Sequence, residues 1–578
     1  MTRSLHTLVK HGLTAIVFIV CVPTQADCML QATELQQACD TTADLSSAGL
    51  WEGEIDSEKH VCLLLHMERG QFARVRIEKR SGFDDYVDPS VYRPSDSVPF
   101  LRVDGEIPQR VLSWQAHEPG TYTVVLSIPS RARDVKVTVL EIEHPDSLAA
   151  RRAAEATDPR VAWLADRAIP IRTLDLADVD FADLEPLRPL LDNTRVVLLG
   201  EADHGDGSDF LAKSRLVRFL HAEMGFDVLA FESGLWDMWR AGREIADGGD
   251  PMVSFAQGAS FVWSYSRQLE PLVAYVAAAA RSPRPLVLAG FDLQPSGGGS
   301  DTMIAELRTF LEAERISGPF ADPESPESQL LKRLHGWAYR PAPDSMTLAS
   351  FESAVGTTAD RIEQKVNTPV GWYWARILRN DALLSAWVWP QWPNARTRFC
   401  ATETCRNSGD RYLIIEETRG VIMAENLSWL ANHQYPGRKI IVWAHNAHIM
   451  RNLSLTESGT GSPYSMGDGV WSEFGSESYA IALVSYQGSY RWPRPQSSTL
   501  NIVPDQRPEA EFEELMAAVG LPIALVDIRA AVAEGAWLAG PFLARPINHY
   551  TDQSRWGLNV DAFLFIRNQE PSVAIPTP

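Results

Sequence analysis

The chain has 578 residues, more than one compact hydrophobic core normally contains, so two or more domains are expected. Hydrophobic residues make up 45% of the sequence, which excludes a disordered or fibrous protein. The formal net charge of −21 makes the phosphate backbone of nucleic acids an unfavourable partner.

The first 26 residues have the pattern of a secretory signal peptide. A basic start is followed by an apolar run over residues 13–22 and by a cleavage site after Ala26. The apolar run is shorter than the roughly 20 residues that a membrane-spanning helix needs. We therefore expect a secreted or periplasmic protein without an integral membrane segment in the mature chain.

Cysteine usage fits an oxidising compartment. Two of Cys28, Cys39 and Cys62 can pair, and Cys400 with Cys405 can close a short loop. The odd number of cysteines after the signal leaves one thiol over. Their spacing does not match a zinc site.

Residues 27–145 are predicted to form a small all-β, sandwich-like module. Short runs rich in Val, Leu and Ile occur over 61–67, 72–80, 122–128 and 135–142, with turn residues between them. We found no cluster of chemically reactive side chains in this part of the sequence.

Residues 146–578 are predicted to form an α/β catalytic domain. Apolar runs without alternation, such as "RVVLLG", "DVLAFE", "PLVLAGFD" and "RKIIVWA", are separated by helical patterns. Strands of this kind are covered on both faces, which indicates a mainly parallel sheet with flanking helices. The later runs "YAIALVSY", "PIALVDI" and "DAFLFI" extend the same pattern.

A helical insertion is expected over about 300–420, where strand signals are few. It contains a tryptophan-rich stretch that includes Trp372, Trp374, Trp387, Trp389 and Trp392. These aromatic side chains either fill the core of a helical hairpin or form the walls of a lid over a bulky apolar ligand. The sequence leaves both readings open.

Ionisable side chains collect where the predicted strands end. Glu201 and His204 follow the first strand of the α/β domain, and the others are Glu232, Asp292, His445 and His448. Ligands of open parallel sheets bind beyond the carboxyl ends of the strands. Any one of these residues alone is more simply a helix cap, but all of them at one edge indicate a functional site.

Several sequence blocks resemble those of the erythromycin esterase-like hydrolase family. They are "LLGEADHG", "LVRFLHAEMGFDVLAFES", "GFDLQ", "RGVIMAENLSWL" and "VWAHNAHI", and they cover about residues 160–567. Two positions depart from the family pattern: Asp203 replaces a small or hydroxyl residue, and Gly420 follows Arg419 where the family has Asp. The departure at Asp203 bears on the substrate more than on the type of reaction.

The resemblance implies hydrolysis of carboxylic esters or lactones, macrolide lactones among them, by activated water without a covalent intermediate. His204 would be the general base, completed by Glu201, Glu232, His445 and His448, with Arg215, Asp292, Arg419 and Asn446 binding the substrate. The residue types agree, because a neutral imidazole takes a proton from water and a carboxylate three residues away can orient its ring. His445 or His448 could stabilise the oxyanion or protonate the leaving alkoxide.

Two alternatives use the same residues differently. The histidine and glutamate side chains could instead hold zinc or manganese in a metal-dependent hydrolase, although the primary expectation is a reaction without cofactor. The pocket could also bind a bulky hydrophobic molecule without catalysis. No Gly-x-Ser-x-Gly motif is present, which disfavours a serine nucleophile.

Overall fold

The computed structural model describes residues 39–55, 60–79, 88–95, 101–102, 109–127, 133–296, 299–389, 402–403, 411–456, 464–493, 501–503 and 512–575. The predicted signal peptide, Cys28, Cys400 and Cys405 lie outside these ranges. No helix in the described ranges has both the length and the apolar character needed to cross a membrane.

The N-terminal part is a β-sandwich. One sheet has the order β1 (Thr41–Asp44), β3 (Val61–Met67), β8 (Gly120–Ser127), β5 (Asp88–Tyr92) and β6 (Leu101–Arg102). The other has the order β2 (Leu50–Ile55), β9 (Arg133–Glu143), β4 (Phe72–Lys79) and β7 (Gln109–Gln115). Apolar side chains of both sheets share one buried core. A disulfide joins Cys39 to Cys62, as one of the predicted pairings.

The second part contains a sheet of nine strands within the described residues. Its order is β10 (Ile169–Pro170), β17 (Ile523–Asp527), β20 (Ala562–Gln569), β15 (Ser478–Tyr490), β11 (Val196–Leu199), β14 (Lys439–Trp443), β12 (Phe226–Gly234) and β13 (Val287–Asp292), with β16 (Asn501–Val503) paired to β15. From β20 to β13 all neighbours are parallel. β10, β16 and β17 pair antiparallel. The sheet is therefore mainly parallel.

Two apolar layers enclose this sheet, which explains why apolar and polar residues do not alternate along its strands. In β11, Val196 and Leu198 face one layer, while Val197 and Leu199 face the other. The first layer includes α11, α14, α17 and α19, and the second includes α6, α8 and α10. The domain is thus an α/β/α arrangement of three layers.

The helices have the following bounds. On or near the sheet lie α6 (Gly207–Met224), α7 (Leu235–Ala246), α8 (Pro251–Gly258), α9 (Phe261–Ser264), α10 (Glu270–Ala279), α17 (Arg411–Trp429), α18 (Asn446–Ile449), α19 (Met466–Phe474), α20 (Phe512–Val519) and α21 (Ile528–Ala533). The helices that precede α6 in the chain are α2 (Leu45–Ala48), α3 (Pro145–Glu155), α4 (Pro159–Arg167) and α5 (Arg188–Leu191).

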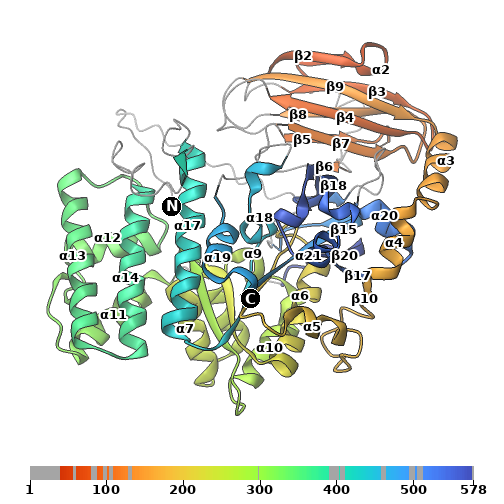
Figure 1. Ribbon diagram of the computed structural model, residues 1–578. Helices are drawn as coiled ribbons and strands as arrows, with labels where there is room; N and C mark the ends of the chain where they lie inside the picture. Colours follow the sequence, from red (N-terminus) through yellow and green to blue (C-terminus); the bar gives the residue numbers. More distant parts are fainter. Residues whose placement is uncertain are drawn as a thin grey trace, which may run out of the picture.

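The predicted insertion is helical. It contains α11 (Ser300–Ala313), α12 (Pro326–His335), α13 (Ser345–Lys365) and α14 (Pro369–Val388), which form the bundle beside α7 and α17 in Figure 1. Trp374 and Trp389 are buried in its core, and Trp239 of α7 stacks on Tyr373 with ring centroids 4.6 Å apart. Trp374 and Trp389 therefore fill the core of the bundle, while Trp372 and Trp387 are half-buried and Trp392 lies outside the described residues.

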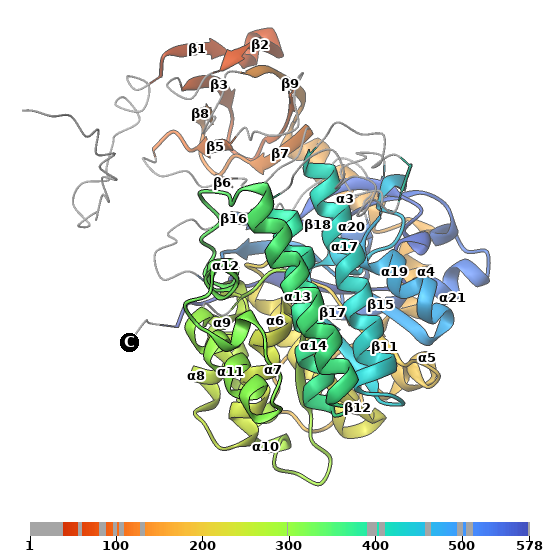
Figure 2. The same ribbon diagram turned by 90° about the vertical axis from the view of Figure 1, so that its left-hand side faces the viewer.

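The β-sandwich sits against the α/β domain on the side of a hairpin formed by β18 (Phe542–Ile547) and β19 (Tyr550–Ser554). β19 contacts β7, and β16 contacts β6. Figure 2 shows β6 and β16 next to each other below the sandwich. The two parts therefore meet near the edge at which the parallel strands end.

Candidate active site

The parallel strands bring the predicted ionisable residues to one edge of the sheet. β11 is followed by Glu201 and His204, and its neighbour β14 is followed by His445 and His448. Glu232 lies near the end of β12, and Asp292 ends β13. The imidazole rings of His204 and His445 have centroids only 5.1 Å apart, although 240 positions separate them in the sequence.

His204 and Glu201 form the first half of the site. The Nδ1 atom of His204 lies 2.8 Å from Oε1 of Glu201. Because an ionised carboxylate only accepts hydrogen bonds, Nδ1 carries the proton and Nε2 is left as the basic atom. Burial alone would lower the pKa of His204, but Glu201, together with Glu232 and Asp203, outweighs it and raises the pKa above its ordinary value.

Glu201 is held in place from two further sides. Trp263 donates its indole N–H to Oε1 at 2.8 Å, and Lys213 forms an ion pair with Oε2. Lys213 is fully buried, which lowers its pKa, and its ammonium lies 4.1 Å from the centre of the Trp443 ring. The carboxylate that orients His204 therefore has little freedom to turn.

Glu232, Arg419, His448 and Asp292 form the second half. The guanidinium of Arg419 donates to Glu232 Oε1 at 2.7 Å and to both oxygens of Asp292 at 3.1 and 2.7 Å. His448 Nε2 lies 3.1 Å from Glu232 Oε1 and 3.1 Å from Arg419. Burial would raise the pKa of Glu232, but the positive charges of His448 and Arg419 outweigh it and hold this pKa well below the usual range.

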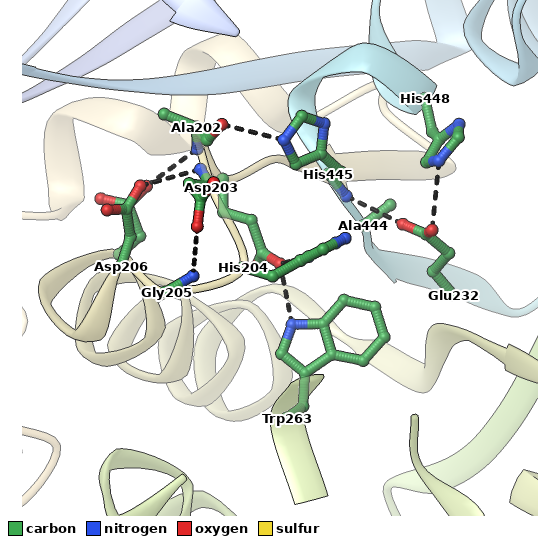
Figure 3. Close-up of polar contacts among 12 residues, drawn as sticks. Ala202, Asp203, His204, Gly205, Asp206, Glu232, Trp263, Ala444, His445 and His448 are labelled. Atoms are coloured by element: carbon green, nitrogen blue, oxygen red, sulfur yellow. Dashed lines mark hydrogen bonds and ion pairs between the residues drawn. The ribbon is translucent and has the colours of Figure 1, made fainter. Parts of the chain in front are cut away.

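His445 connects the two halves and is itself fully engaged (Figure 3). Its backbone N–H donates to Glu232 Oε2 at 3.0 Å, and Ala447 N–H donates to its Nδ1 at 3.1 Å. Nε2 then carries the proton, which it donates to the Ala202 carbonyl at 2.8 Å and to Asn548 Oδ1 at 3.1 Å. Burial, followed by the charges of His204 and His448, lowers the pKa of His445 well below its ordinary value. Both ring nitrogens of His445 thus have partners within the protein.

Three polar side chains of the cluster remain open to solvent. The exposed fractions are 20% for His204, 16% for His448 and 15% for Arg419, whereas Glu201 and Glu232 are 0% and 4% exposed. A substrate reaching this edge would meet the imidazoles of His204 and His448 and the guanidinium of Arg419. The anionic side chains stand behind them and fix their orientation.

The match to known protein families agrees with this arrangement. The family model described as "Erythromycin esterase" matches residues 221–568, which is more than half of the chain. The chain belongs to the erythromycin esterase family. The match begins after Glu201 and His204. In the structure these two residues nevertheless lie beside His445, which is inside the matched region.

Relatives and solved structures are consistent with this family. The chain is 25% identical over 419 residues to the putative hydrolase YbfO of Bacillus subtilis, covering 72% of this chain and 92% of that protein. It is also 40% identical over 72 residues to an erythromycin esterase type II of Escherichia coli, which is 12% of this chain and 17% of that one.

Among solved structures, a Bacillus cereus protein matches with a TM-score of 0.60 and 18% identity, over 73% of this chain and 99% of its own. A mutant of the erythromycin esterase EreC in its open conformation matches with a TM-score of 0.51 and 16% identity, over 71% of this chain and 100% of its own. These likenesses show that the erythromycin esterase fold is shared.

Two residues predicted to bind substrate lie elsewhere. Arg215 forms a two-pronged ion pair with Asp183 at 2.8 Å and is 1% exposed, so it braces helix α6 from the side away from the site. Asn446 is completely buried, and its amide spans the carbonyls of Leu483 and Pro546 at 2.8 and 2.6 Å. Both side chains are therefore engaged with other parts of the fold, and these contacts do not support the substrate-binding role predicted for them, which stays a prediction.

Several residues of the site were not singled out from the sequence. Lys213 continues the helical spacing of the apolar residues Phe210, Val217 and Leu220, which is a signal for burial. Trp263, Asn548 and His549 come from distant segments that carry no motif. The carboxylates Asp206 and Asp209 accept hydrogen bonds from the backbone of Asp203 and Ala202, and so hold the turn that carries His204.

The donor set does not fit a metal ion as it stands. In the described ranges no group of three or more His, Cys, Asp or Glu side chains is arranged to hold one. His445 presents N–H rather than a lone pair at Nε2, and Glu201 is saturated by Lys213, Trp263 and His204. Metal binding would require several of these contacts to break.

Proposed function

We propose that this protein hydrolyses carboxylic esters, lactones included, with a water molecule that His204 activates directly, without a covalent intermediate and without a metal cofactor. Membership of the erythromycin esterase family supports a hydrolase. The observation that carries the mechanism is the His204–Glu201 pair, in which Nδ1 faces the carboxylate at 2.8 Å while 20% of the side chain is exposed. That geometry leaves Nε2 to receive a proton from water.

In the proposed reaction, His204 Nε2 removes a proton as the water oxygen attacks the ester carbonyl. The carbonyl oxygen becomes an oxyanion, and Arg419 and His448 are the cationic and N–H groups exposed beside it. When the tetrahedral intermediate collapses, the imidazolium of His204 returns its proton to the leaving alkoxide. Glu201 stabilises that imidazolium, because its carboxylate accepts the Nδ1–H hydrogen bond of His204 at 2.8 Å.

Macrolide lactones are the substrates that we propose to test first. The similarity to an erythromycin esterase type II supports this choice, although it covers only 72 residues. The half-buried Trp387, near the C-terminal end of α14, adds apolar surface to the insertion. A substrate of this kind would make the protein a determinant of macrolide resistance.

We also propose that the protein acts outside the cytoplasm. The disulfide between Cys39 and Cys62 supports an oxidising compartment, as does the pattern of residues 1–26. Cell fractionation with detection of the processed chain would test this location.

The decisive experiment measures turnover of a panel of lactones and simple esters by mass spectrometry, in water enriched in ¹⁸O. We expect one heavy oxygen in the acid product and no acylated protein at any time point. Activity should survive dialysis against a chelator and disappear in His204→Asn. Loss of activity on chelation with recovery on adding zinc or manganese would instead establish a metallohydrolase, and a stoichiometric acyl adduct would establish a covalent mechanism.

A further inference from the structure

The tip of the β18–β19 hairpin has an unusual backbone for its sequence. Ile547 pairs with Tyr550, so the loop consists of Asn548 and His549, whose φ angles are 48° and 57°. Two-residue hairpins with positive φ at both positions favour Asn followed by Gly. Histidine at the second position is strained relative to glycine, and such strain is typical of places where the side chain has a function.

The His549 side chain reaches the turn that carries the proposed base. It is 3% exposed, and its Nε2 lies 3.0 Å from Oδ1 of Asp206. The other oxygen of Asp206 accepts the backbone N–H of Asp203 at 2.9 Å, and His204 is the next residue. His549 is therefore connected to the backbone of His204 through a single carboxylate.

Asn548 contacts both segments that meet in the site. Its backbone N–H donates to the carbonyl of Ala202 at 2.7 Å. Its side-chain oxygen accepts the N–H of His445 Nε2 at 3.1 Å. The same residue thus ties the turn after β11 to the turn after β14.

The next residue connects the hairpin to the β-sandwich. Tyr550 packs against the buried core of the sandwich, and β19 contacts β7. The hairpin is consequently anchored on one side by the N-terminal module and on the other by the site. The N-terminal module is therefore connected through the hairpin to the proposed reacting groups.

We propose that Asn548 and His549 are positioning residues, which hold the His204 turn and His445 in register, and that the β-sandwich anchors them through Tyr550. The proposal rests on the proposed ester hydrolysis, because the groups that are positioned are those assigned to that reaction. It makes the sandwich a working part of the enzyme rather than a separate attachment domain.

The test uses the full-length protein with glycine substitutions, which keep positive φ available at the turn. We expect Asn548→Gly and His549→Gly to lower kcat at least ~10-fold while KM changes little, because misplaced reacting groups slow the chemical step. Arg315→Gly is the matched control, since Arg315 is exposed in the helical insertion and also has positive φ, 52°. Its kcat should equal that of the parent enzyme.

A second measurement does not depend on turnover. With ¹⁵N-labelled histidine, the ring signals of His445 should report a proton on Nε2 in the parent protein and in Arg315→Gly. In Asn548→Gly the Nε2 proton should exchange faster with water, and in His549→Gly the titration of His204 should shift. Unchanged kcat or unchanged histidine signals in both hairpin variants would overturn the proposal. A parent protein inactive on every ester, with histidine signals that still respond, would refute the ester hydrolase while supporting the positioning role.

Discussion

Two buried histidine–carboxylate pairs in this molecule have nearly the same geometry and different surroundings. His204 lies 2.8 Å from Glu201 at the edge of the sheet, and His335 of α12 lies 2.9 Å from Asp381 of α14 in the helical insertion. In both pairs burial opposes the positive charge on the ring, the carboxylate outweighs it, and the histidine pKa is raised. A perturbed histidine therefore does not by itself identify the active site.

The surroundings separate the two. His204 is 20% exposed and its carboxylate has two further partners, whereas the side chains of His335 and Asp381 are 6% and 2% exposed. Asp381 Oδ2 and His335 Nδ1 have no hydrogen-bond partner within the described part of the chain, and the ring meets Trp236 edge-on at 6.3 Å. Catalytic potential comes from an accessible imidazole on a carboxylate that is fixed from several sides.

The largest expected effect is that of His204→Asn. We expect kcat to fall by about 10²–10⁴-fold, because general-base help is lost, with little change in the melting temperature. His335→Asn is the matched variant, and its kcat per folded molecule should equal that of the parent. Equal activity losses in the two variants, measured on chromatographically purified folded protein, would contradict a special role of His204.

Arg419→Gln should have the next largest effect. Removing the cation beside the proposed oxyanion should lower kcat by roughly 100-fold. Arg451 forms a comparable buried pair with Asp561, at 3.0 Å, away from the cluster. Arg451→Gln should lower stability without changing kcat; if it reduced kcat as strongly, Arg419 would have no special role.

The pair in the insertion should matter for stability. His335→Leu leaves Asp381 buried without its partner, and we expect the free energy of unfolding to fall by about 3 kcal/mol. The double variant with Asp381→Leu should lose less than the single variant, since no uncompensated polar group remains. Urea denaturation of the four proteins measures this coupling, and strictly additive losses would contradict it.

The smallest expected effect is a shift in pH dependence. Because Glu201 raises the pKa of His204, kcat/KM should rise with pH through a pKa above the ordinary value of 6.5. Glu201→Gln should move this rise to lower pH. The stability contribution of the pair runs the opposite way: it is complete below pH 6.5 and is lost as pH rises through the folded-state pKa. An activity profile unaffected by Glu201→Gln would show that the carboxylate is not the cause.

The apolar runs in the sequence predicted the fold of the two parts of the chain. They also predicted the site residues that lie where the parallel strands end. The strands β3, β4, β8 and β9 follow the apolar runs that were identified, and parallel neighbours necessarily end at one edge. Glu201, His204, Glu232 and His445 could be found because each directly follows or ends such a run. The sequence of each apolar run and of the residues directly after it was therefore enough to find these four positions.

The remaining parts depend on contacts that no local pattern encodes. Arg215 and Lys213 are two positions apart on α6, and the helical spacing places them on different sides but does not identify their partners, Asp183 and Glu201. Asn548 and His549 enter the site from more than 340 positions away, along a hairpin whose docking is set by the sandwich. Asn446 lies between His445 and His448 in the sequence, yet its side-chain amide donates to two backbone carbonyls.

The buried amide of Asn446 has a consequence for how this enzyme can change. It links β15 to β18, its backbone N–H donates to the Glu201 carbonyl at 2.8 Å, and a Cβ at Gly200 would collide with it. Asn446 therefore joins three segments of the sheet edge, and we expect this edge to tolerate substitutions poorly. Variants selected for a new substrate range should accordingly have their substitutions in the helical bundle. Random mutagenesis followed by selection would show whether the substitutions lie there or at the sheet edge.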